Sequence, residues 1–186
     1  MGVNGMNLAV KEDAVLAVID LQEKLMPAMA NAQQLEHTAL KLIKGLKILG
    51  VPAIVTQQYT KGLGATIPSV AQALGDYEPV EKTTFSAMKE PAFAEALKKS
   101  GKKTVILIGI EAHICVQQTA LQLLEEGCRV YVIRDCIASR SETDSACSMQ
   151  RMAAAGVVIT TYESILYELL GGAGEEGFKA ISSIVK

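Results

Sequence analysis

The sequence has no tryptophan, and aromatic residues make up only 4% of its 186 residues. Proteins that hold single-stranded nucleic acid rely on aromatic stacking platforms in a basic groove. Here 18 lysines and arginines stand against 20 aspartates and glutamates, which gives a formal net charge of −2 without a run of basic residues. We therefore expect no nucleic-acid partner.

Long apolar runs and metal-binding motifs are also missing. Hydrophobic residues make up 49% of the chain, yet no uninterrupted apolar stretch reaches the roughly 18 residues of a membrane-spanning helix. The N-terminal segment lacks the basic and apolar regions of a secretory signal. The four cysteines form no Cys-x-x-Cys pair, and there are only two histidines. We expect no metal site, no cofactor, no membrane association and a reducing, cytoplasmic location.

The chain does contain six short aliphatic runs separated by longer amphipathic segments. The runs are continuous rather than alternating, which is typical of strands covered on both faces. They lie at residues 14–20, 52–57, 79–81, 104–109, 129–134 and 156–160.

Amphipathic helices are predicted between these runs. Leucines recur at helical spacing over residues 35–49 and stop before Gly50, a residue type that often ends helices. Residues 116–124 form a second helix, and Ser141 opens a third with a capping box. Alternating strands and helices predict right-handed βαβ units and a parallel sheet.

We therefore predict one α/β domain over residues 1–186. It is a three-layer α/β/α sandwich with a six-stranded parallel sheet, Rossmann-like, in the order 3-2-1-4-5-6. Ligands of such sheets bind beyond the carboxyl ends of the strands. The residues directly after each aliphatic run are thus the candidates for chemistry.

Asp20 ends the first run, Lys82 follows the third directly, and Cys115 lies six residues beyond the fourth. Asp20 is either a carboxylate at the ligand edge or an ordinary helix cap. Lys82 is a solvated surface lysine unless the fold brings it beside the other two. Cys115 is either a buried core residue or a nucleophile, because a helix N-terminus and a nearby cation both favour thiolate.

The remaining candidates are assigned simpler roles. His113 lies two residues from Cys115 and is either its base or part of a pocket wall. We favour the wall, since Asp20 is available as a base. The other three cysteines are expected to be packing residues: Cys128, Cys136 and Cys147.

These residues give the sequence a resemblance to the isochorismatase-like cysteine hydrolase superfamily. The resemblance runs from about Ala14 to the C-terminal helix and rests on residues 18–22, 82–86 and 109–116. More narrowly, residues 56–64 and 135–141 resemble the isochorismatase domain-containing proteins.

The resemblance implies a catalytic triad of Asp20, Lys82 and Cys115. It also implies a cis peptide bond between Ile110 and Glu111, and an oxyanion hole formed by the backbone N–H groups of Glu111 and Cys115. The implied reaction cleaves a C–N bond of a small-molecule amide through a thioester. Relatives commonly form homo-oligomers, dimers or larger, so we expect one here.

The sequence also departs from parts of the superfamily. Nicotinamidases hold a metal with an aspartate and histidines after the second strand, whereas residues 57–59 are Gln, Gln and Tyr here, which implies no metal. Glu111 stands where many amidases have a small residue, so it either narrows the pocket or favours a cationic substrate. Gln58, Tyr59 and Phe85 are candidates for the pocket wall, with loop packing as the alternative.

Two other functions stay open at this stage. A hydrolase fold can be retained by a non-catalytic binding or scaffold protein. Cys115 can also act as a thiol redox sensor, although no resolving cysteine is evident near it.

Overall fold

A parallel sheet of six strands organises residues 8–186, the part of the chain that the computed structural model describes. The strands are β1 (Ala14–Ile19), β2 (Ala53–Gln58), β3 (Val80–Lys82), β4 (Thr104–Ile110), β5 (Arg129–Ala138) and β6 (Val158–Thr160). Their order is β3-β2-β1-β4-β5-β6, and the predicted fold and strand order are confirmed. Residues 1–7 of the predicted domain, with much of the segment inspected for a secretory signal, lie outside the described residues.

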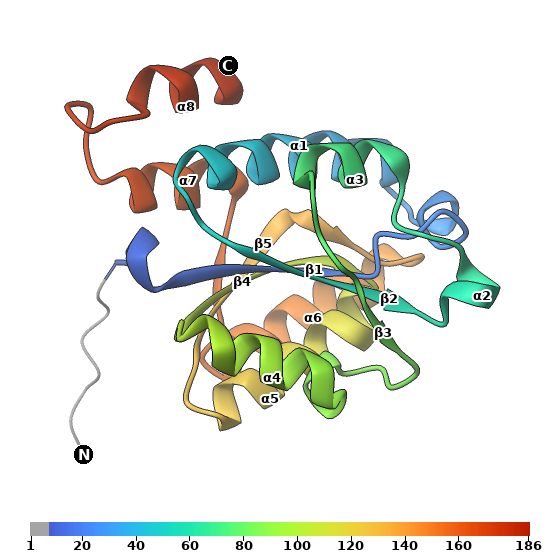
Figure 1. The fold of residues 1–186 in the computed structure, drawn as a ribbon. Coiled ribbons are helices and arrows are strands. Elements are labelled where there is room, and N and C mark those ends of the chain that lie inside the picture. The colour runs from blue at the N-terminus through green and yellow to red at the C-terminus, as the bar shows by residue number, and fades with distance from the viewer. Residues whose placement is uncertain (1–7) are drawn as a thin grey trace.

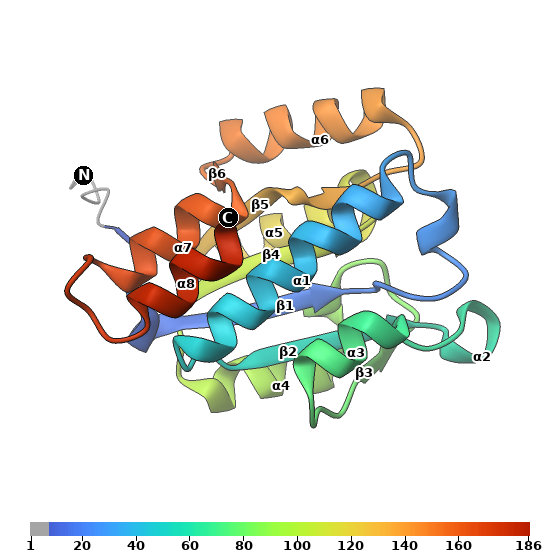
Figure 2. The ribbon, with the colours of Figure 1, turned by 90° about the horizontal axis from the view of Figure 1, so that it is seen from above.

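Helices cover both faces of the sheet (Figures 1 and 2). One layer holds α1 (Ala32–Ile48), α3 (Pro68–Leu74), α7 (Tyr162–Leu170) and α8 (Phe178–Val185). The other holds α4 (Pro91–Ser100), α5 (Gln117–Glu125) and α6 (Glu142–Ala154). The short α2 (Thr60–Leu63) follows β2, and single turns lie at η1 (Lys11–Asp13), η2 (Met26–Ala28), η3 (Ala87–Lys89) and η4 (Ala112–Val116).

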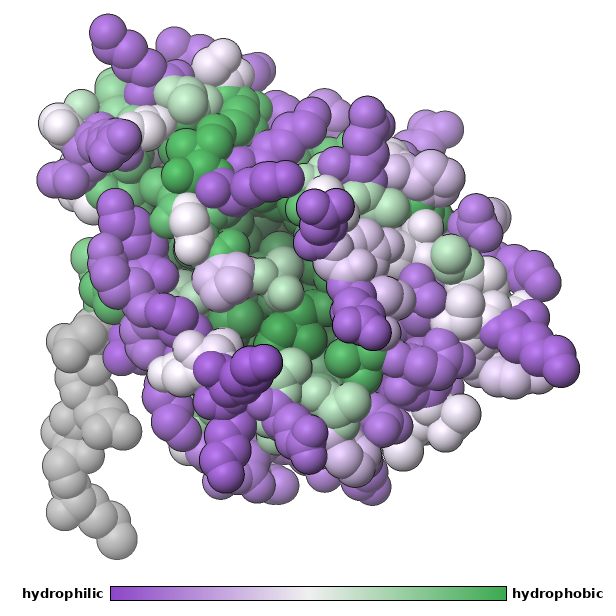
Figure 3. Space-filling model, in the orientation of Figure 1, coloured by the Kyte–Doolittle hydropathy of each residue, from purple (hydrophilic) through white to green (hydrophobic). Residues whose placement is uncertain are grey.

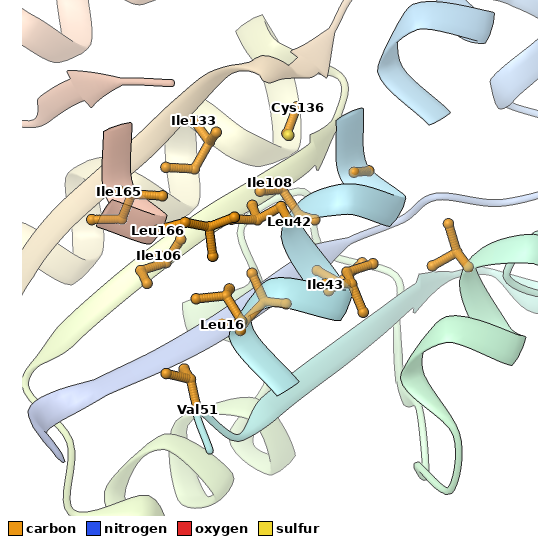
Figure 4. Close-up of a cluster of buried hydrophobic side chains, with 14 of the residues drawn as sticks. Leu16, Leu42, Ile43, Val51, Ile106, Ile108, Ile133, Cys136, Ile165 and Leu166 are labelled. Carbon is orange, nitrogen blue, oxygen red and sulfur yellow. The ribbon is translucent and has the colours of Figure 1, made fainter. Parts of the chain in front are cut away.

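The alternation of side chains along the central strands divides the core into two layers. Every residue of β1 is buried, as expected for a strand covered on both faces. Leu16 and Val18 join the cluster under α1 and α7, while Val15 and Ala17 join the cluster over α4 and α5. Figure 4 shows part of the first cluster, where Leu16 lies among residues of α1, β4 and β5.

The predicted helix ends are visible in the backbone. Gly50, just after α1, has a φ of 73°, a left-handed conformation that glycine adopts without steric cost. At the start of α6, the Ser141 hydroxyl accepts a hydrogen bond from the Asp144 N–H at 3.3 Å. This contact is the N-terminal cap that the sequence pattern predicts.

An irregularity in β5 shapes the ligand edge of the sheet. Leu107 of β4 pairs with Val132 of β5, but Gly109, two residues on, pairs with Ile137. The extra residues in β5 make a bulge, a feature that changes where the following side chains point. Ala138 is thereby paired with Ile110, so the chain after β5 runs beside the chain after β4.

The surface is mixed in polarity. Figure 3 shows polar side chains around most of this face, with apolar side chains gathered near α8 and between the two helical layers. Across residues 8–186, none of the helices combines the length and the apolar character that crossing a bilayer requires.

Candidate active site

Asp20 follows β1 directly and is fully buried. Its φ is 52°, a left-handed conformation that is uncommon outside glycine. The Thr56 hydroxyl, from β2, donates a hydrogen bond to Asp20 Oδ1 at 2.7 Å. A buried carboxylate with strained backbone and a fixed orientation is a pattern that clusters at functional sites.

Gly109 lets β4 approach the strand that carries Asp20. Its φ is +123°, and a Cβ placed there would lie 2.0 Å from the backbone oxygen of Ile19. Only a residue without a side chain fits this close approach. The glycine therefore sets the spacing of β1 and β4 at the edge where Asp20 emerges.

Lys82 ends β3, and only 1% of its surface is exposed, so it is not a solvated surface lysine. Its Nζ lies 2.6 Å from Asp20 Oδ2 and donates to Gln58 Oε1 at 2.6 Å. It also donates to the backbone oxygens of Thr84 and Phe85, both at 3.2 Å. The ammonium group is thus surrounded by oxygen acceptors, as a buried cation must be.

Cys115 lies in η4, a π-helical turn between β4 and α5, and is 7% exposed. π-Helical turns are rare and frequently occur at functional sites. Lys82 Nζ lies 3.6 Å from Cys115 Sγ. Asp20, Lys82 and Cys115 therefore meet at the carboxyl edge of the sheet, although they come from three separate strand ends.

The protonation of Cys115 differs from the sequence-based expectation. Burial raises the pKa of the thiol to about 12, helped by the negative charge of Asp20, and Lys82 lowers it too little to compensate. This direction is opposite to the lowering that the helix N-terminus and the nearby cation were expected to produce. Lys82 is already paired with Asp20, so a thiolate would add an unpaired negative charge to a buried site.

Gln58 and Gln22 support this group. Gln58 accepts from Lys82 through Oε1, and its Nε2 donates to the Thr83 backbone oxygen at 2.9 Å. Gln22 is fully buried; it donates to the Gln58 backbone oxygen at 3.0 Å and accepts from the Gln58 N–H at 2.7 Å. The sequence analysis assigned Gln22 no role, although residues 18–22 carry part of the family resemblance and Gln22 lies two residues after Asp20.

The chain around Glu111 is held by the segment after β5. The peptide bond between Ile110 and Glu111 is cis. The Glu111 carboxylate accepts from Arg140 Nε at 3.1 Å and from the Arg140 backbone N–H at 3.0 Å. Because Glu111 already has a cationic partner, it is poorly placed to select a cationic substrate. His113 Nδ1 lies 2.9 Å from Ser139 Oγ, so this ring also contacts the segment after β5.

Two of the expected pocket residues lie at the surface. Tyr59 is 51% exposed and Phe85 is 56% exposed, whereas Gln58 has both ends of its amide engaged with Lys82 and Thr83. Phe85 contributes a backbone oxygen to the Lys82 ammonium. The two rings are therefore candidates for the rim of a site whose interior is polar.

The remaining cysteines only partly match their expected role. Cys128 and Cys136 are buried, as expected of packing residues, but Cys147 is exposed on α6. Ser148 and Met152 supply the buried face of that helix, and Cys147 lies outside it. Among residues 8–186, no group of three or more His, Cys, Asp or Glu residues is arranged to hold a metal ion.

Comparison with known proteins agrees with this architecture. Residues 14–164 match the family model of the isochorismatase domain. Isochorismatase domain-containing protein 1 of Salmo salar is 39% identical over 167 residues, which cover 90% of this chain and 59% of that protein. The chain therefore spans less than two thirds of that relative.

Two solved structures are similar over nearly the whole chain. One, described as the MAR1 ribonuclease of Caenorhabditis elegans, has a TM-score of 0.90 at 39% identity and covers 96% of this chain and 92% of its own. The other is YcaC of Pseudomonas aeruginosa with hexane-2,5-diol and covalent acrylamide; its TM-score is 0.90 at 25% identity, over 96% and 92% of the two chains. On this evidence, the chain belongs to the isochorismatase domain family, within the isochorismatase-like hydrolase superfamily.

Proposed function

We propose that the chain is a cysteine-dependent hydrolase that cleaves a C–N bond of a small amide through a thioester intermediate. The observation that carries the proposal is the buried group of Asp20, Lys82 and Cys115, in which the ammonium lies 2.6 Å from the carboxylate and 3.6 Å from the sulfur. A buried ion pair is a poor way to gain stability. A nucleophile next to a base and a cation is what covalent catalysis requires.

The protonated thiol assigns a specific task to Asp20. Moving the proton from Cys115 to Asp20 turns a carboxylate and a thiol into a carboxylic acid and a thiolate. The total charge of the buried site stays the same, and Lys82 stays beside the new anion. Thiolate therefore forms at the moment of attack, with Asp20 as the general base.

The remaining steps use the same groups. The thiolate attacks the substrate carbonyl carbon, and the N–H groups of Glu111 and Cys115 bind the resulting oxyanion, an interaction often worth about 3 kcal/mol. Asp20 gives its proton to the leaving nitrogen as the C–N bond breaks, and a thioester remains. Asp20 then takes a proton from water, and the resulting hydroxide attacks the thioester carbonyl carbon. As the C–S bond breaks, the carboxylic acid leaves and Asp20 returns its proton to the Cys115 sulfur, which restores the carboxylate and the thiol.

The substrate is a small molecule that enters past the rim. Tyr59, Phe85 and His113 are our candidates for the pocket wall. The Glu111–Arg140 pair gives no preference for a cationic substrate.

The proposal also covers assembly and location. We expect a homo-oligomer, as the family resemblance implies. All four cysteines are free, which fits a reducing, cytoplasmic setting.

The scaffold and redox-sensor alternatives are less favoured. A scaffold gains nothing from a buried lysine, carboxylate and thiol held in contact. A redox sensor needs an accessible thiolate, whereas Cys115 is buried and burial raises its pKa to about 12.

Ribonuclease activity is the second candidate. It is favoured by the 39% identity to the protein described as the MAR1 ribonuclease. A single-stranded RNA incubated with the purified chain tests it directly. Cleavage that survives Cys115→Ala would place the activity outside the proposed site.

Ammonia release from a panel of primary amides tests the main proposal. We expect wild type and Cys147→Ala to turn over at least one amide, while Cys115→Ala falls to the uncatalysed rate. Cys147 is the matched control because it is an exposed cysteine on α6, and the contacts of Asp20 and Lys82 described above do not include it. Equal turnover by the two alanine variants would refute cysteine catalysis.

A further inference from the structure

We propose that Gln58 is a positioning residue that fixes the Lys82 ammonium between Asp20 and Cys115. The inference rests on the proposed function. It concerns a side chain for which the sequence indicated either a pocket wall or loop packing.

The contacts of Lys82 are the first step. Its Nζ has two very close oxygen partners, Asp20 Oδ2 and Gln58 Oε1, both at 2.6 Å, and a longer contact of 3.6 Å to Cys115 Sγ. A lysine ammonium sits on a flexible four-carbon stem and carries three donors. Its position is therefore decided by its acceptors, and Asp20 alone would draw it toward β1.

The sheet explains why Gln58 can oppose that pull. Gln58 and Lys82 are register partners in the parallel pair of β2 and β3. Partner residues on neighbouring strands project to the same face. The Gln58 and Lys82 side chains therefore leave adjacent backbone positions of the sheet, and their contact does not depend on the conformation of a loop.

The orientation of the amide is also fixed. Nε2 of Gln58 donates to the Thr83 backbone oxygen at 2.9 Å, which leaves Oε1 toward Lys82. A flipped amide would place two donors together at Lys82 and two acceptors together at Thr83. The oxygen thus faces the ammonium in the only arrangement that satisfies both neighbours.

Gln22 holds the backbone from which this amide extends. It donates to the Gln58 backbone oxygen, accepts from the Gln58 N–H, and donates to the Gly64 oxygen at 2.7 Å. Gln22 lies two residues after Asp20 on the same strand exit. The carboxylate and the amide that hold Lys82 are thereby tied to each other.

A neutral acceptor suits this position better than a carboxylate. Because the Gln58 amide is neutral, the charges of Asp20 and Lys82 cancel as long as the Cys115 thiol keeps its proton. A second carboxylate would leave the site negatively charged and oppose thiolate formation. Without the Gln58 oxygen, Lys82 keeps Asp20 at 2.6 Å and the backbone oxygens of Thr84 and Phe85 at 3.2 Å. Asp20 is then its one short-distance partner, and the contact of Lys82 with Cys115 weakens.

The rate of Cys115 alkylation by iodoacetamide, followed from pH 7 to 10, tests the inference without a known substrate. Cys147→Ser is the background, and Gln57→Met is the matched control for Gln58→Met. Gln57 is an adjacent, buried glutamine whose side chain bonds Thr60 and Thr66 instead. We expect Gln58→Met to slow Cys115 alkylation about tenfold at each pH, a displacement of the rate profile by about one unit. Gln57→Met should stay within twofold of the background.

A double-mutant cycle separates positioning from a general packing effect. If Gln58 acts through Lys82, Gln58→Met has no further effect in a Lys82→Met background. Equal rates for Gln58→Met and Gln57→Met, or an undiminished effect without Lys82, would overturn the inference. If Lys82→Met itself leaves alkylation unchanged, the proposed function fails as well, so the two failures are distinguishable.

Gln58→Glu decides the question if Gln58→Met does not fold. It keeps the side-chain length and an oxygen toward Lys82, but it adds a negative charge. We expect alkylation to slow at least tenfold at pH 7. A rate within twofold of the background would show that position 58 is not coupled to the thiol.

Discussion

At the scale of single residues, Lys82 belongs to the proposed catalytic group and also affects the stability of the fold. It is a lysine with 1% exposure whose charge is balanced by an equally buried aspartate. Removing one member of a buried ion pair leaves an uncompensated charge, which typically costs about 3–5 kcal/mol. Replacing both members removes the charges together.

We therefore predict that Lys82→Met lowers the free energy of unfolding by about 3 kcal/mol or more at pH 7, because Asp20 loses its partner. The double variant Asp20→Asn/Lys82→Met should recover most of that loss. Urea denaturation monitored by circular dichroism measures both. If the stability losses of the single variants Lys82→Met and Asp20→Asn simply add in the double variant, Asp20 and Lys82 do not form a stabilising ion pair in the folded chain.

The cysteines give a second prediction at this scale. With a pKa of about 12, the thiolate fraction of Cys115 at pH 7 is roughly 10⁻⁵, compared with about 3 × 10⁻² for a free cysteine. Limiting iodoacetamide at pH 7 should label the exposed Cys147 first, and labelling of Cys115 should rise with pH. Peptide mass mapping reads out both sites. Preferential labelling of Cys115 at pH 7 would show that its thiolate is already formed at rest.

At the scale of elements, Asp135 links β5 to α7. Its Oδ1 accepts a hydrogen bond from the Tyr162 N–H, in the first turn of α7, at 3.0 Å. Burial raises the pKa of this carboxyl above its ordinary value of 3.8. The charged form is therefore disfavoured in the folded chain, and this cost develops as pH rises above that ordinary value.

We predict that Asp135→Asn keeps the contact to α7 and melts at the same or a higher temperature than wild type at pH 7. The advantage should disappear near pH 3, where wild type is protonated in both states. Asp135→Ala should lower the free energy of unfolding by about 1 kcal/mol, because the Tyr162 N–H at the start of α7 loses its acceptor. Thermal melts from pH 3 to 7 measure all three proteins. A wild type that gains stability over Asp135→Asn with rising pH would reverse the assigned direction.

A substitution at Gly109 tests whether the close spacing of β1 and β4 is required for the fold. Gly109→Ala should destabilise the fold by more than about 3 kcal/mol, because its Cβ would meet backbone atoms that no side-chain movement relieves. Gly172→Ala is the control, since the nearest atom to its Cβ is 3.9 Å away, and it should change stability by less than about 0.5 kcal/mol. Chemical denaturation compares them. Similar stability for the two variants would mean that β1 and β4 separate easily.

At the scale of the whole molecule, local patterns predicted the sheet and the edge where the site lies. Continuous apolar runs such as residues 104–109 indicate a strand that is covered on both faces of the sheet. The chain that leaves each run then lies at the ligand edge, which made Asp20, Lys82 and Cys115 candidates, and the family resemblance implied that they act together. The helices α3 and α4 were not predicted, although Pro68 and Pro91 open them and are a recognised signal.

Long-range contacts explain what the sequence did not predict. The protonation of Cys115 depends on how closely Lys82 is paired with Asp20, and no spacing along the chain encodes that distance. The contact of Glu111 with Arg140 depends on the bulge in β5. The exposure of Cys147 depends on which face of α6 packs against the sheet, which Ser148 and Met152 decide.

The central claim is that Cys115 carries the substrate as a thioester. The most direct measurement is an acid quench of the chain during turnover of an amide found in the ammonia assay, followed by intact mass and peptide mapping. We predict a mass increase equal to the acyl group, located on Cys115 and removed by hydroxylamine. Turnover with no adduct on Cys115, or with an adduct on another residue, would contradict the account.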